Sequence, residues 1–189
     1  MTFSARTTLL AVIGLLVCCP AVSGQQATSQ PVSRLIRRYV VTTPAATAAS
    51  ASPSLAEASA IERRAFEQTN QIRVQNGLSP LEWDADVCRM ARVHSENMAR
   101  RNFFSHVSPD GSRMRDRARL AGIIAYKVMG ENIAYNQGYE DPGAFAVERW
   151  MASEKHRANI LSPEFRAMAI GMFIAPDGSV FLTQTFITR

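Results

Sequence analysis

Residues 168–186 read Met-Ala-Ile-Gly-Met-Phe-Ile-Ala-Pro-Asp-Gly-Ser-Val-Phe-Leu-Thr-Gln-Thr-Phe, and this stretch decides the class of fold. Residues 168–174 and 180–186 are rich in the aliphatic and aromatic side chains that favour strands. The residues between them include Pro-Asp-Gly, which is turn chemistry, so the stretch predicts an antiparallel hairpin. Residues 130–135 predict a third strand.

Helical patterns precede the hairpin, since apolar residues recur there at spacings of three and four. Asp84 and Ser112 are expected N-caps, and Asp141 stands before a proline that suits the first turn of a helix. The expected helices cover about residues 61–76, 85–98, 113–121 and 142–150. Helices first and strands last, without regular alternation, predict an α+β fold in which helices cover an antiparallel sheet.

The beginning of the chain has the features of an exported protein. Residues 1–24 predict a secretory signal peptide, because Arg6 precedes an apolar run too short to span a bilayer and small residues follow it. An uncleaved anchor is the alternative interpretation. Residues 25–56 form a linker rich in Ala, Ser, Thr and Pro, interrupted by the apolar and basic run 35–41, and the folded domain is expected at residues 57–189.

Cysteine usage and charge narrow the class of protein. Two of the three cysteines belong to the predicted leader, so Cys88 alone remains and is expected to be a small core residue without a disulfide. The net charge of +5 could favour anionic envelope polymers or phospholipid head groups, although a solvated basic face is the preferred interpretation. The arginines of that expected face are Arg113, Arg115, Arg117 and Arg119. No motif indicates a nucleic-acid partner.

Two of the three histidines lie in polar segments punctuated by glycine. His106 follows two phenylalanines in a turn-rich segment, Glu131 lies in Gly-Glu-Asn, and His156 lies in Glu-Lys-His-Arg. Imidazoles and carboxylates together suit a divalent-metal site or acid–base chemistry. His94 is instead expected to be a hydrogen-bonded core residue, because it lies on the inner stripe of the second helix. Trp150 and the phenylalanines are likewise expected in the core.

Seven motifs occur in a characteristic order along the chain. They are Thr69-Asn70-x-x-Arg73-x-x-Asn76-Gly77-Leu78, Leu81-x-Trp83, Ala91-x-x-His94-Ser95-x-x-Met98-Ala99, Phe104-Ser105-His106-x-Ser108-Pro109-Asp110-Gly111, Gly130-Glu131-Asn132-Ile133-Ala134, Trp150-Met151-x-Ser153-x-x-His156-Arg157-x-Asn159-Ile160-Leu161 and Ile170-Gly171-Met172. Each is weak alone, but in this order they resemble the bacterial branch of the CAP superfamily, the SCP-like domain. Its relatives include cysteine-rich secretory proteins and plant pathogenesis-related proteins, and the resemblance covers about residues 57–188.

The resemblance implies a three-layer α-β-α sandwich with a central antiparallel sheet and one polar cleft. That cleft carries two histidines and two acids in the family, and eukaryotic members hold a divalent metal between the histidines. His106 and His156 match the histidine positions, and Glu131 matches the first acid. For the second acid, Ser153 falls at the family's position, which leaves Glu154 and Glu148 as candidates.

The expected function is that of an exported ligand-binding module whose cleft holds a weakly bound divalent metal, with zinc favoured. Two imidazoles alone leave a weak, exchangeable site that water completes. The ligand is unknown, with lipid or an envelope polymer as candidates, and no transmembrane helix is expected in the mature chain. One alternative is a metal-assisted hydrolase acting on a peptide or envelope polymer, for which Ser105 or Ser108 beside His106 would be weak evidence of a nucleophile. The other is a structural protein in which the His/Glu cluster braces loops.

Overall fold

The centre of the molecule is a four-stranded sheet with the strand order β1-β3-β4-β2. The computed structural model describes residues 54–189, so the predicted leader and nearly all of the linker lie outside the described residues. Strands β3 (Ala167–Ile174) and β4 (Val180–Thr188) form the predicted hairpin. Strand β2 (Val128–Asn136) is the predicted third strand and pairs antiparallel with β4. The short β1 (Glu82–Trp83) pairs parallel with β3 and was not predicted.

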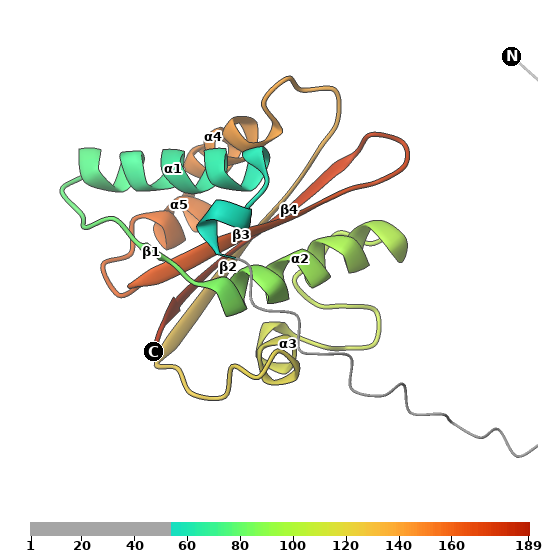
Figure 1. Cartoon of the computed structure of the whole chain (residues 1–189), viewed down its shortest axis with the longest axis horizontal. Helices are drawn as coiled ribbons and strands as arrows, with labels where there is room; N and C mark the ends of the chain where they lie inside the picture. Colours follow the sequence, from blue (N-terminus) through green and yellow to red (C-terminus); the bar gives the residue numbers. More distant parts are fainter. Residues whose placement is uncertain (1–53) are drawn as a thin grey trace, which may run out of the picture. The chain divides into compact units, whose positions relative to one another are not determined.

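Helices cover both faces of this sheet, as Figure 1 shows. The helices α1 (Ala60–Gln75), α4 (Pro142–Ala152) and α5 (Glu154–Ile160) lie on one face. The helices α2 (Ala85–Arg100) and α3 (Met114–Leu120) lie on the other, and a 3-10 turn (Leu55–Glu57) precedes α1. The predicted α-β-α sandwich is therefore confirmed.

Each face of the sheet has its own apolar core, because successive side chains of a strand point to opposite faces. Met168 and Ile170 of β3 belong to the core that includes Trp150, whereas Ala169 between them belongs to the core that includes Cys88. Cys88 is fully buried as predicted, and burial raises the pKa of its thiol to about 12.

Side-chain caps begin three of the helices, and one predicted cap is wrong. The carboxylate of Asp84 accepts from the Val87 N–H at 3.0 Å, and that of Asp141 accepts from the Ala144 N–H at 2.9 Å. Ser112 does not cap α3, whose N-cap is Arg113. The physical reason is that the backbone of Ser112 closes the preceding turn, where its carbonyl accepts from the Ser108 N–H at 2.9 Å.

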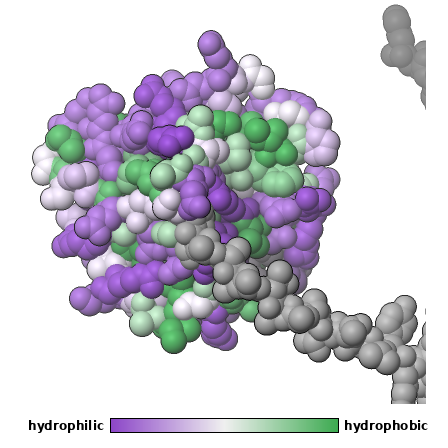
Figure 2. Space-filling view, in the orientation of Figure 1, coloured by the Kyte–Doolittle hydropathy of each residue, from purple (hydrophilic) through white to green (hydrophobic). Residues whose placement is uncertain are grey.

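The surface of the domain and the lengths of its helices show whether a described segment could cross a membrane. Polar side chains cover most of the face seen in Figure 2, with small apolar areas between them. Within residues 54–189, every helix is too short or too polar to cross a membrane.

Candidate functional site

The candidate site lies along β2, which ends the sheet and pairs with a strand on one edge only. Odd-numbered residues of β2 face the layer of α2 and α3, where Glu131 meets residues of both helices. Even-numbered residues face α4 and α5, where the Asn132 side chain donates a hydrogen bond to the His156 carbonyl. Side chains of β2 therefore contact the helices on both faces of the sheet, beside the edge of β2 that pairs with no described strand.

Glu131 is buried on the first of these faces and is held by two partners. Its Oε1 accepts from His106 Nδ1 at 2.8 Å, and its Oε2 accepts from Arg117 Nη2 at 2.5 Å. Burial acts to raise the pKa of Glu131, but the hydrogen bond from His106 and the charge of Arg117 outweigh it and lower the pKa below its usual value. An ionised Glu131 holds the His106 proton on Nδ1, which leaves the Nε2 lone pair available to a ligand or a metal.

His94 supports this arrangement from within the core, as predicted. Its side chain is 0% exposed, and its Nε2 lies 3.2 Å from the Ser105 carbonyl oxygen and 4.0 Å from Glu131 Oε1. Burial lowers the pKa of His94 to about 4, so the ring is neutral at pH 7. A neutral Nε2–H that donates to Ser105 ties the segment that carries His106 to α2.

His156 faces the groove from the first turn of α5 and is partly exposed. Burial lowers its pKa, and the charge of His106 lowers it further. The position of α5 is fixed by amides. Asn132 Nδ2 donates to the His156 carbonyl at 3.2 Å, and Asn159 Nδ2 donates to Asn132 Oδ1 at 2.8 Å. Gln184 of β4 extends the network by accepting from Asn132 Nδ2 at 2.9 Å.

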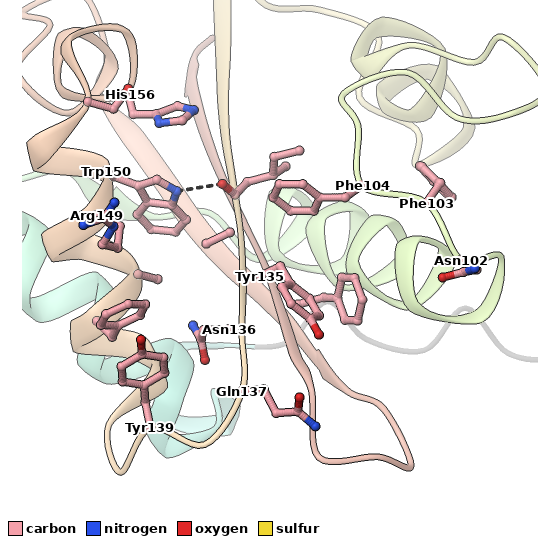
Figure 3. Close-up of a pocket in the computed structure, with 16 residues that line it drawn as sticks. Asn102, Phe103, Phe104, Tyr135, Asn136, Gln137, Tyr139, Arg149, Trp150 and His156 are labelled. Carbon is pink, nitrogen blue, oxygen red and sulfur yellow. Dashed lines mark hydrogen bonds between the residues drawn. The ribbon is translucent and has the colours of Figure 1, made fainter.

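A groove of about 1070 Å³ runs from His156 along residues 133–137. Figure 3 shows its two sides, with Trp150, Arg149 and Tyr139 on one side of β2 and Phe104 on the other. Trp150 Nε1 donates to the Ile133 carbonyl at 2.9 Å, which fixes the indole against the strand. The walls are strongly aromatic, with Phe103, Phe104, Tyr135, Tyr139, Phe145, Trp150 and Phe181 among the lining residues.

Of the predicted site residues, His106 and Glu131 are in direct contact, and His156 lines the groove, whose lining residues do not include His106 or Glu131. Glu148 and Glu154 are exposed and are not among the residues that line the groove, so the second acid stays a prediction. Ser108 is only 6% exposed, and no hydrogen bond joins its hydroxyl to His106 in the part of the chain that the structure describes. Across residues 54–189 there is no cluster of three or more His, Cys, Asp or Glu that could hold a metal ion.

Two expectations about side chains are wrong. Phe104 was expected in the core, but it is 52% exposed because its loop places it over Tyr135 at the rim of the groove. Arg117 was counted in a solvated basic face, whereas it is buried against Glu131. A sequence signal existed, since Met114, Arg117, Ala118 and Ala121 have the spacing of one helix face. The other three arginines of that segment are exposed.

Comparison with known proteins identifies the family to which the chain belongs. The family model described as "CAP: Cysteine-rich secretory protein family" matches residues 66–186. Two Bacillus subtilis proteins are each 40% identical: the uncharacterized membrane protein YlbC, over 68% of this chain and 34% of its own length, and the uncharacterized protein YkwD, over 69% and 48%. The chain thus spans between a third and a half of the length of these relatives.

Comparison with solved structures also identifies proteins with this fold. An extracellular SCP-domain protein from Bacillus anthracis superposes with a TM-score of 0.60 at 33% identity, over 68% of this chain and 40% of that one. An outer surface protein from Borrelia burgdorferi shares the fold alone, with a TM-score of 0.59 at 16% identity over 66% and 89% of the two chains. The chain is a bacterial-type member of the CAP family of cysteine-rich secretory proteins.

Proposed function

We propose that this CAP-domain protein is exported and binds a ligand in the groove along β2, next to a labile divalent-metal site at His106 and His156. The observation that carries the proposal is the continuity of the groove, which begins at the His156 imidazole and follows the unpaired edge of β2. The predicted leader supports export, and the Bacillus anthracis relative is described as extracellular.

The two imidazoles fit a weak metal site and not a closed structural one. His106 has Nε2 to offer because Glu131 engages Nδ1, and the His156 ring makes no hydrogen bond with any residue between 54 and 189. Two nitrogen ligands leave the remaining coordination positions to water or to the ligand, which is typical of an exchangeable zinc site. Glu131 would orient one imidazole from behind. A bound zinc ion would attract an anionic or carbonyl oxygen of the ligand to this end of the groove.

The rest of the groove is suited to recognition. Aromatic rings offer large apolar contact area at a small cost in side-chain entropy, and Arg149 adds a positive charge. A binding role is favoured over a serine-based hydrolytic one because Ser108 is buried and its hydroxyl is not hydrogen-bonded to His106.

Thermal unfolding with and without ZnCl₂ tests the proposal. Zinc at one hundred times its dissociation constant should stabilise the folded domain by about 2.7 kcal/mol and raise Tm by several degrees, because only the folded state brings the two imidazoles together. His106→Ala and His156→Ala should each abolish this increment. His94→Gln is the control: it should lower the starting Tm and keep the increment. An equal zinc increment in the wild type and both alanine variants would overturn the metal site.

A further inference from the structure

Building on the proposed function, we infer that the unpaired edge of β2 binds an extended acidic peptide by adding it to the sheet as a further strand. Three independent features of the groove support this ligand class: the backbone edge, the two walls and the charge.

The backbone edge of β2 is open over part of its length. The carbonyls of Glu131 and Ile133 point away from β4 and are occupied, the first by Asn159 Nδ2 at 3.3 Å and the second by Trp150 Nε1 at 2.9 Å. Backbone groups of a strand alternate in direction, so those of Tyr135 face the same edge as those of Ile133. No hydrogen bond from the described residues reaches the Ile133 N–H or either backbone group of Tyr135 on that edge. An open edge of this kind is a template for another strand.

The walls of the groove stand on both faces of this open edge. Figure 3 shows Tyr139 and Arg149 on the α4 side and Phe104 on the opposite side, with β2 between them. An added strand would send alternate side chains toward the two walls. Phe104 and Tyr135 form one wall, with ring centroids 6.4 Å apart, and the stacked Tyr139 and Phe145 form the other, at 3.6 Å.

The charge of the groove selects an acidic partner. Its 16 lining residues include Arg149 and His156 but neither Asp nor Glu. Arg149 is exposed, and its guanidinium makes no hydrogen bond or ion pair within residues 54–189. Arg64 on the neighbouring α1, by contrast, is paired with Asp141 at 3.0 Å. A fatty acid could also pair with Arg149, but an acyl chain would leave the β2 backbone groups unpaired, whereas a peptide backbone matches them.

Fluorescence anisotropy with a labelled synthetic hexapeptide of alternating valine and glutamate tests the inference on the whole mature chain. The peptide should bind saturably, and the matched valine–lysine peptide should bind at least tenfold more weakly. Two N-methylated forms of the acidic peptide test the strand pairing, one methylated at the odd-numbered amides and the other at the even-numbered amides. Because only alternate amides of an added strand face β2, one form should bind at least tenfold more weakly and the other should bind nearly as well as the unmodified peptide. Arg149→Gln should weaken binding of the acidic peptide at least fivefold, whereas Arg119→Gln, an exposed arginine of α3, should not.

Equal binding of both peptides, or equal loss in both N-methylated forms, would overturn the inference. Binding of palmitate without binding of the acidic peptide would also overturn it. Failure of this inference can be distinguished from failure of the proposed metal site. A rise in Tm with ZnCl₂ that requires both His106 and His156 would still support the metal site even if no peptide binds.

Discussion

At the scale of the residue, the site depends on one buried carboxylate. Glu131 connects His106 of the loop after α2 with Arg117 of α3, so it holds that loop against the helix. The sequence leaves open whether this residue is structural or functional; its contacts show the structural role, and its role beside a metal stays a proposal.

Replacing Glu131 with glutamine should be strongly destabilising. Glu131→Gln would leave the buried Arg117 guanidinium without a counter-charge, which costs about 3 kcal/mol in the free energy of unfolding. Urea unfolding measures this cost. Glu96→Gln is the matched control, because the exposed Glu96–Arg100 pair at 2.6 Å should contribute less than about 1 kcal/mol. Similar losses in the two variants would contradict the importance assigned to Glu131.

His94 should make stability depend on pH in the mildly acidic range. Its pKa is lowered from 6.5 to about 4 in the folded state, mainly by burial. Between these values the unfolded chain binds a proton that the folded chain does not, so stability falls as pH drops through this window, by on the order of 3 kcal/mol. Urea unfolding between pH 7 and 4 should show a shallower fall in His94→Gln. Identical pH slopes in wild type and variant would show that His94 is not the titrating group.

The sequence predicted His106, Glu131 and His156 as neighbours because motifs of a known family mark their positions. It did not predict Arg117 as the partner of Glu131, because charge alone suggested solvent exposure. The burial expected of Phe104 was wrong for the converse reason: apolar character predicts burial, but Phe104 lies at the rim of the groove and is exposed.

At the scale of the element, the packing of α2 on β3 depends on Gly171. A Cβ atom at this position would lie 2.1 Å from the Arg92 backbone nitrogen and 2.3 Å from the Ala91 carbonyl carbon. The helix and the strand therefore approach more closely than any side chain would allow, which explains glycine in the middle of an aliphatic strand.

Gly171→Ala should accordingly destabilise the domain by about 3 kcal/mol or prevent folding, because the clash is with backbone and cannot be relieved by rotating a side chain. Gly111→Ala is the control: its φ of +85° is strained for alanine, but nothing lies within 4 Å of the added atom, so a loss of about 1 kcal/mol is expected. Circular dichroism and thermal melts distinguish the two. A Gly171→Ala protein as stable as the Gly111 variant would contradict the close approach.

The long elements were predictable and the short ones were not. The hairpin and the four predicted helices follow from periodicity and caps that act locally. Strand β1 has two residues and exists only because β3 pairs with it, and α5 has seven residues that are held on β2 by side-chain amides. Neither can be predicted from local sequence, because distant residues stabilise both.

At the scale of the whole molecule, the site is assembled from segments far apart in the chain. The groove joins residues 102–104, β2, α4, the start of α5 and one side chain of β4. The family resemblance predicted a cleft containing His156, but the course of the groove could not be predicted, because it depends on β2 lying at the edge of the sheet.

The described residues should fold without the predicted leader and linker. Residues 25–53 carry few apolar side chains that could offset their ordering entropy. A polypeptide of residues 54–189 should therefore match the Tm of the mature chain within a few degrees by calorimetry. A larger decrease would indicate that the run 35–41 contributes to the fold.

The central claim is that His106 and His156 face one cleft and bind a metal together, and nitrogen NMR of the three histidine side chains tests it most directly. Before zinc, His106 should show a protonated Nδ1, set by Glu131. During a ZnCl₂ titration at pH 7, the ring nitrogens of His106 and His156 should shift together with one dissociation constant, while the buried His94 should not shift. Signals that move for only one of the two histidines, or with two unrelated dissociation constants, would contradict a shared site.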